Sequence, residues 1–212
     1  MTTTPTTAVR PAPAPPPAAG AGSWPDLLSA ATDDCLSVLR AGAGQDWSRL
    51  AGDLDWTCRQ TLDHLALGLI GYAGLLVARP ADRYITLFAA LDPKAPVHAC
   101  MEGVGIAAAL LTSTVRDTAA EARAWHPWGS SDAAGFAAMG ITELAVHTHD
   151  IAGTFGIPWA PPESLSAAVL TRLFPDAPPG HAASDTLLWC TGRIALPGLP
   201  RRASWRWDGT AR

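Results

Sequence analysis

The sequence predicts an all-α protein: an antiparallel four-helix bundle followed by short helices and a small extended segment. Four long stretches between residues 23 and 153 repeat apolar side chains every three or four positions, which is the period of an amphipathic helix. Capping residues and helix breakers bracket these stretches. Four helices of this length are typical of an antiparallel bundle.

The first helix is expected between Ser23 and Gly42, because serine can cap a helix at its start and glycine commonly ends one. Its apolar positions recur at helical spacing: Leu27, Leu28, Ala31, Cys35, Leu36 and Leu39. They predict one face that packs into the core.

The second helix is expected from Thr57 to Val77. Thr57 and Gln60 have the spacing of a capping box, in which each side chain accepts a hydrogen bond from the backbone of the other residue. Pro80 ends the helix, because proline cannot continue the hydrogen-bond ladder. His64 then lies about two turns inside it.

The third helix is expected from Val97 to Val115. Ser131 or Asp132 can cap the fourth, which runs to about Gly153. Beyond it, a pair of prolines opens a short helix that ends at residue 173, and another short helix is expected at 186–194. Aromatic and polar side chains alternate at 204–208, which predicts an extended segment that presses Trp205 and Trp207 onto the bundle.

The composition predicts one domain, residues 23–212, behind a short tail. Residues 1–22 are rich in proline, alanine and threonine, which is typical of a disordered segment. The formal net charge is −4, and Lys94 is the only lysine, so a nucleic-acid-binding surface is not expected.

The cysteines and the apolar runs predict a cytoplasmic protein that does not span a membrane. The four cysteines are scattered and form no CxxC pair, as in proteins of a reducing compartment. The amino-terminal residues lack the uninterrupted apolar stretch of a signal peptide. Later apolar runs are interrupted by glycine, proline or charge.

Glu143 and His147 are the most informative residues of the chain. They stand four positions apart, so both side chains lie on one helix face and can meet at one point. Their surroundings are apolar, and buried ionisable groups are tolerated mainly when they are paired or bound to a metal. His64 is the best third ligand, because it also lies in an apolar helical run far away in sequence. A weak, solvated pair on an exposed helix is the alternative.

A His, a Glu and a second His with an open fourth position is the ligand set of catalytic zinc, although another divalent metal can take the same ligands. Asp150 falls on the same stripe as the two ligands of the fourth helix, so it can accept a hydrogen bond from a ligand imidazole or from a substrate thiol. Arg193 lies among apolar residues. It holds either a carboxylate of a cofactor or substrate, or a distant Asp or Glu of the chain.

Small residues near the predicted ligands have two interpretations. Gly68 and Gly71 on the second helix and Gly140 on the fourth either leave room for a ligand or let the helices approach closely. Asp63 is expected to be a solvated helix residue. Three other histidines are interpreted as surface or loop residues with no metal role: His98, His126 and His181. His149 is expected to face away from the stripe that carries Glu143 and His147.

Two segments resemble the signature regions of the DinB-like bundles, the family of mycothiol-dependent maleylpyruvate isomerase. They are residues 55–65, with His64, and residues 143–152, with the Glu-x-x-x-His pair. Residues 187–197 and 205–207 resemble the carboxy-terminal part of short actinobacterial relatives, so the similarity covers about residues 23–212. The resemblance implies that His64, Glu143 and His147 are the metal ligands.

The resemblance also implies an activity. A thiol transferase or isomerase of this kind uses a low-molecular-weight thiol such as mycothiol, whose metal-bound thiolate attacks a small electrophile. The namesake enzyme has an additional carboxy-terminal domain that this chain lacks, so the maleylpyruvate reaction itself is not implied. A metal enzyme that acts without a thiol, by hydrolysis or biosynthetic rearrangement, and a non-catalytic metal-binding interaction protein are the alternatives. Each of these functions is compatible with a monomer or a homodimer.

Overall fold

The computed structural model describes residues 22–212, and in this range the chain forms six helices and no regular strand. The prediction of an all-α protein is therefore confirmed. The predicted disordered tail lies outside the described residues, except for its last position. The helices are α1 (Trp24–Ala41), α2 (Cys58–Ala78), α3 (Val97–Asp117), α4 (Ala133–Phe155), α5 (Glu163–Leu173) and α6 (Ala183–Cys190).

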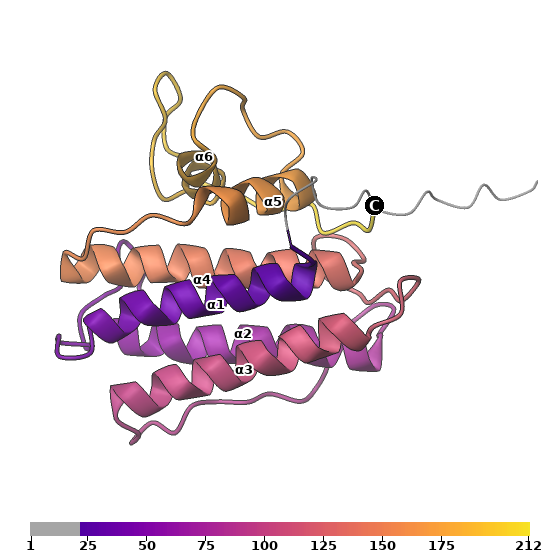
Figure 1. The fold of residues 1–212 in the computed structure, drawn as a ribbon, viewed down its shortest axis with the longest axis horizontal. Helices are drawn as coiled ribbons and strands as arrows, with labels where there is room; N and C mark the ends of the chain where they lie inside the picture. Colours follow the sequence, from indigo (N-terminus) through magenta and orange to yellow (C-terminus); the bar gives the residue numbers. More distant parts are fainter. Residues whose placement is uncertain (1–21) are drawn as a thin grey trace, which may run out of the picture.

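The four long helices pack side by side, and the short helix α5 covers α4 (Figure 1). Helix α4 contacts all three other long helices, and α5 packs on its opposite side. Helix α6 packs on α5. Helix α4 is consequently the most enclosed element, which explains why its sequence contains no lysine or arginine.

The helix starts are those that the capping residues predict. Ser23 and Thr57 each form a full capping box, with Asp26 and Gln60 respectively. The side chain of Asp132, rather than that of Ser131, caps α4 by accepting a hydrogen bond from a backbone N–H group of the first turn. These caps fix where α2 and α4 begin, and so the depth at which the candidate ligands lie.

Of the carboxy-terminal elements, the last short helix differs from the prediction. Helix α6 spans Ala183–Cys190 rather than 186–194, because Gly192 has a left-handed backbone (φ 72°) that ends the helix. The expected extended segment at 204–208 forms no strand. Trp207 is nevertheless buried, and Trp205 packs against the same core, so the two tryptophans do press onto the helices.

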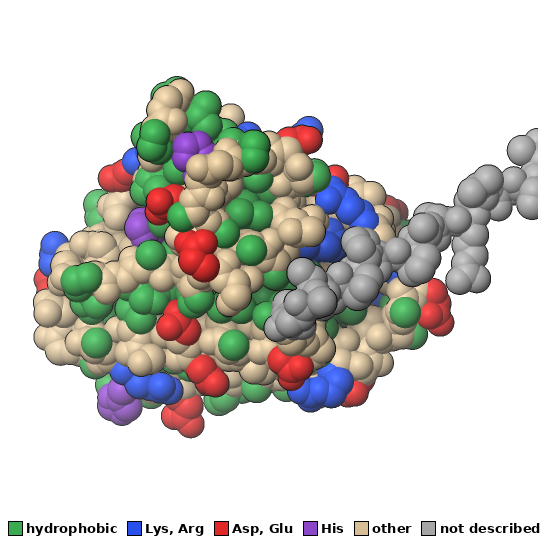
Figure 2. Space-filling view, turned by 45° about the horizontal axis from the view of Figure 1, so that its top comes forward, with side chains coloured by type: hydrophobic (Ala, Val, Ile, Leu, Met, Phe, Trp, Pro, Cys, Tyr) green, Lys and Arg blue, Asp and Glu red, His purple; other side chains and the backbone are tan. Residues whose placement is uncertain are grey.

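A single hydrophobic cluster draws on all six helices. Two of them, α2 and α3, are long and apolar enough by length and composition to cross a membrane. Both also bury one face in this cluster, as the core helices of other proteins do. On the face shown in Figure 2, acidic side chains are spread singly, and basic ones lie toward both ends.

Candidate metal centre

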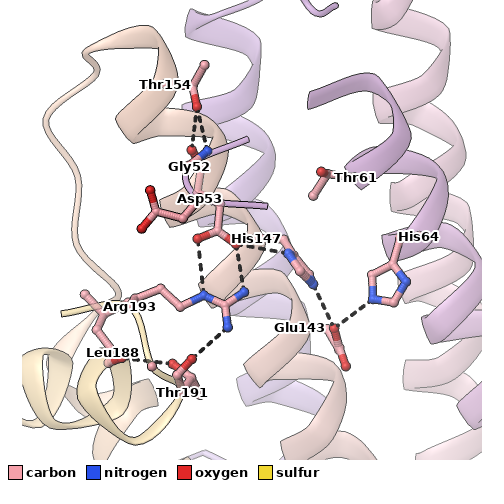
Figure 3. A network of polar contacts seen from close by, with 12 residues as sticks. Gly52, Asp53, Thr61, His64, Glu143, His147, Thr154, Leu188, Thr191 and Arg193 are labelled. Carbon is pink, nitrogen blue, oxygen red and sulfur yellow. Dashed lines mark hydrogen bonds and ion pairs between the residues drawn. The ribbon is translucent and has the colours of Figure 1, made fainter. Parts of the chain in front are cut away.

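Helices α2 and α4 bring the three predicted ligands together (Figure 3). Glu143 and His147 lie one turn apart on α4, and His64 faces them from α2. Because α3 separates these two helices in the chain, the meeting of the ligands depends on tertiary packing. Among residues 22–212, these three form the only such group of possible metal ligands.

The distances fit a small divalent cation. The Nε2 atom of His64 lies 3.3 Å from Oε2 of Glu143, and Nε2 of His147 lies 3.2 Å from the same oxygen. One ligand atom from each residue can be chosen so that all lie within 4.8 Å of one another. Tetrahedral zinc with bonds of about 2.0–2.1 Å separates its ligand atoms by about 3.3 Å. The two distances to Oε2 of Glu143 match this separation, so the three residues could hold a divalent metal ion.

The hydrogen bond on the far side of His147 strengthens this conclusion. The Nδ1 atom of His147 lies 3.2 Å from Oδ2 of Asp150. A carboxylate only accepts, so Nδ1 must carry the hydrogen. In a neutral imidazole Nε2 is then an acceptor, and it faces the carboxylate of Glu143, which is another acceptor. Only a second proton on His147 or a cation between these atoms makes that contact favourable.

Asp150 therefore lies where the sequence predicted it, behind a ligand imidazole. Arg193 binds it with two nitrogens: Nη2 lies 2.8 Å from Oδ2 of Asp150, and Nε lies 3.2 Å from Oδ1. The third guanidinium nitrogen donates to the carbonyl of Thr191 at 2.8 Å (Figure 3). The predicted pairing of Arg193 with a distant acid is confirmed. A cofactor-binding role stays a prediction, and each nitrogen of Arg193 already has an acceptor.

The charges of the centre stabilise one another. Burial alone raises the pKa of Glu143, but hydrogen bonds from His147 and His64 outweigh it and hold the pKa well below its usual range. Burial lowers the pKa of His147, yet the bonds to Asp150 and Glu143 raise it overall. Burial raises the pKa of Asp150, and the bonds from His147 and Arg193 bring it below the usual value. Two carboxylates thus stay ionised around an imidazole that attracts positive charge.

The centre is more accessible on the side of His64. The exposed fraction of the side chain is 34% for His64, 14% for Glu143 and 7% for His147. The indole of Trp56 lies beside His64, with ring centroids 4.7 Å apart, and is itself exposed. A ligand would consequently approach past His64 and Trp56.

The loop that carries Trp56 is fastened to α4. The hydroxyl of Thr154 accepts a hydrogen bond from the backbone N–H of Gly52 at 2.8 Å and lies 2.9 Å from the carbonyl oxygen of Leu50, to which it can donate (Figure 3). Residues about a hundred positions apart in the sequence are joined in this way. The contact holds the aromatic side chain near the ligands of α2 and α4.

The glycines near the centre divide between the two interpretations. A Cβ atom added at Gly68 or Gly71 would meet nothing within 4 Å, so these positions leave open space on α2. A Cβ atom at Gly140 would lie 2.8 Å from Leu111 and 3.2 Å from Leu69. Gly140 therefore serves close helix packing.

The structure changes the interpretation of two single residues. Asp63 is not merely solvated, because its carboxylate accepts a hydrogen bond of 2.7 Å from the backbone of Leu91 and so holds the long loop before α3. His126 lies in the loop before α4, as one form of the expectation has it, but not at the surface. It is buried, and Nδ1 accepts a hydrogen bond from the backbone of Trp128 at 3.2 Å. Burial lowers the pKa of His126 to about 4, although the charge of Glu143 partly opposes the shift.

A cavity of about 590 Å³ lies apart from the ligands, near the carboxy-terminal segment. Trp128, Trp207 and Arg202 line it. Trp125 does not line this cavity and instead packs against the ring of Tyr84. None of the three candidate ligands borders the cavity, so it is not the space beside the metal centre.

Sequence reasoning missed Tyr72. Its hydroxyl lies 3.1 Å from Oε1 of Glu143, and burial followed by the negative charge of Glu143 raises its pKa well above 10. Tyr72 therefore stays a hydrogen-bond donor. The sequence does contain one signal for it: a single tyrosine hydroxyl in an apolar helical run, two turns after His64, needs a hydrogen-bond partner when it is buried.

Comparison with protein-family models, with curated protein sequences and with solved structures finds no match for this chain.

Proposed function

We propose that this protein is a metal-dependent thiol transferase or isomerase whose cation, zinc or another divalent metal, is held by His64, Glu143 and His147. The observation that carries the proposal is the meeting of three donor atoms from α2 and α4 around one point. Structural zinc sites usually have four protein ligands, whereas catalytic sites have three and keep one position open. Three ligands within the described residues favour the catalytic kind.

The fold we propose for this function is a DinB-like antiparallel four-helix bundle. The order of the elements supports it, since one ligand comes from the second long helix and a Glu-x-x-x-His pair from the fourth. The likeness to mycothiol-dependent maleylpyruvate isomerase suggests a low-molecular-weight thiol such as mycothiol as cofactor and a small electrophile as substrate. The four cysteines are free thiols, which supports the cytoplasm as the place of action.

Each residue of the centre has a defined task in this proposal. The two histidines and Glu143 hold the cation, and Asp150 holds the ring of His147 so that Nε2 faces it. When bound, the cation would lower the pKa of a thiol and keep it as thiolate at neutral pH. The open space at Gly68 and Gly71 leaves room for the thiol on the accessible side.

Metal analysis of the purified protein tests the ligand set. The wild-type chain should contain about one equivalent of divalent metal, and His147→Ala should lose it. His149→Ala is the matched control, because this histidine is on the same helix but outside the group of ligands. Equal metal content in wild type and His147→Ala would remove the assignment.

Calorimetry with mycothiol tests the thiol. We expect the metal-loaded protein to bind mycothiol and the His147→Ala variant not to bind it. Metal without thiol binding would favour the alternative in which the centre works by hydrolysis or biosynthetic rearrangement. A bound metal with no coordination position accessible to a thiol or water would instead indicate a non-catalytic protein.

A further inference from the structure

The carboxylate of Glu143 has two oxygens with different surroundings. Oε2 faces both imidazoles, at 3.3 Å from His64 and 3.2 Å from His147. Oε1 lies 3.1 Å from the hydroxyl of Tyr72, its only hydrogen-bond partner among residues 22–212. The two oxygens are therefore divided between the candidate metal and a tyrosine.

The ring of Tyr72 is held in place by its neighbours. The side chain is 8% exposed. Its ring centroid lies 5.8 Å from that of Phe136 and 6.2 Å from that of His126. A ring packed on two sides cannot turn freely, so the hydroxyl stays directed at Glu143.

We propose that Tyr72 is a positioning residue that makes Glu143 bind the metal through Oε2 alone and so keeps the fourth coordination position open for the thiol. The inference rests on the proposed function. The terminal torsion of a glutamate is broad and twofold, so an unrestrained carboxylate can turn both oxygens toward a cation. Carboxylates do bind metals through one or both oxygens. A hydrogen-bond donor on Oε1 favours binding of the metal through the other oxygen alone.

Substitution of Tyr72 by phenylalanine tests this inference, because it removes the hydroxyl and keeps the packed ring. Tyr84→Phe is the matched control, since the ring of Tyr84, like that of Tyr72, packs against His126, but Tyr84 is half exposed and makes no side-chain hydrogen bond within the described chain. Co²⁺ replaces zinc as a coloured probe, because four-coordinate Co²⁺ absorbs visible light more strongly than five- or six-coordinate Co²⁺.

For Tyr72→Phe we expect Co²⁺ to bind about 10 to 100 times more weakly, as with the loss of other groups that orient ligands. Its visible absorption should also weaken, because both oxygens of Glu143 would then bind. Tyr84→Phe should match wild type in both respects. Unchanged affinity and absorption in Tyr72→Phe, or equal changes in both variants, would overturn the inference.

A second measurement keeps the hydroxyl in place. Tyr72 and Tyr84 are the only tyrosines of the chain, so 3-fluorotyrosine in the Tyr84→Phe variant labels Tyr72 alone. Its ¹⁹F resonance should shift when one equivalent of Zn²⁺ is added, because the hydrogen-bonded carboxylate becomes a ligand. Full metal binding with no shift would overturn the role of Tyr72 and leave the ligand set standing. A wild-type chain that takes up no metal would overturn both.

Discussion

Asp150 serves two partners at once, and this double contact gives the residue its importance. One of its oxygens accepts from His147, and both are bound by Arg193. The side chains of Asp150 and Arg193 are 6% and 10% exposed, so the pair is almost completely shielded from water. Loss of the carboxylate would therefore affect the orientation of a ligand and leave a buried charge without its counter-ion.

The variant Asp150→Asn should lose about 3 kcal/mol of unfolding free energy in the metal-free protein, because Arg193 stays buried without a negative partner. Its metal affinity should fall about 10- to 100-fold. Asp53→Asn is the control, since Asp53 pairs with Arg201 at the exposed surface and should cost less than about 1 kcal/mol. Urea unfolding and metal titration measure both effects. A variant that keeps wild-type metal affinity would contradict the orienting role of Asp150.

His126 makes the stability depend on pH. Its pKa in the folded protein is about 4, below the ordinary value of 6.5, so the unfolded chain binds more protons between these values. The contribution of His126 to stability is full above pH 6.5 and is lost as the pH falls toward 4. We expect it to amount to about 2–3 kcal/mol.

The variant His126→Asn tests this expectation, because the amide oxygen can accept the hydrogen bond from Trp128 without taking up a proton. Between pH 6.5 and pH 4, the free energy of unfolding of the variant should fall by about 2–3 kcal/mol less than that of the wild type. Urea unfolding measures both. If the free energy of unfolding depends on pH in the same way in both proteins, a group other than His126 causes the pH dependence.

The residues of the centre differ in how far the sequence predicts them. His64, Glu143 and His147 could be predicted, because helical spacing places two of them on one face and apolar surroundings single out the third. Tyr72 could not, since its partner lies 71 positions away and only the packing of α2 on α4 brings them together. The burial of His126 likewise depends on contacts between distant rings.

The packing of the helices gives two glycines opposite roles. Gly140 lets α4 approach its neighbours, whereas Gly71 faces open space on α2. Alanine is preferred over glycine in a helix by about 1 kcal/mol. Gly71→Ala should therefore stabilise the protein by about 0.5–1 kcal/mol.

For Gly140→Ala we expect the free energy of unfolding to fall by about 1 kcal/mol. The new methyl group would lie too close to Leu111 and Leu69, and this cost exceeds the gain in helix propensity. Thermal unfolding of the two variants under the same conditions measures the difference. Stabilisation of both to the same degree would show that α4 is packed less closely than the structure indicates.

Helix starts were predicted better than helix ends. Ser23 and Thr57 carry the signal in a side chain that satisfies the first turn, and the structure shows both capping boxes. The predicted end of α6 lies too late, because the apolar residues after Gly192 continue the pattern although this glycine, with its left-handed backbone, ends the helix. The segment at 204–208 alternates like a strand, but it has no partner strand and its tryptophans pack on the helices instead.

On the scale of the whole molecule, the candidate metal centre joins helices that are distant in the chain. His64 and Glu143 are separated by 79 positions. Their convergence exists only when α2 and α4 are packed together, so a cation held between them binds the folded state alone. Free metal at 100 times its dissociation constant then stabilises the folded protein by about 2.7 kcal/mol.

We therefore expect zinc to raise the unfolding temperature of the wild-type protein and EDTA to reverse the change. The His147→Ala variant should unfold at the same temperature with and without zinc, since it lacks one ligand of α4. Differential scanning calorimetry at constant protein concentration measures these shifts. An equal response of the variant would place the stabilising metal elsewhere on the molecule.

A crystal of the zinc-supplemented protein, measured on both sides of the zinc absorption edge, tests the central claim most directly. We predict one anomalous peak about 2.0–2.2 Å from Nε2 of His64, Oε2 of Glu143 and Nε2 of His147. No peak between α2 and α4, or a peak bound by other residues, would contradict it.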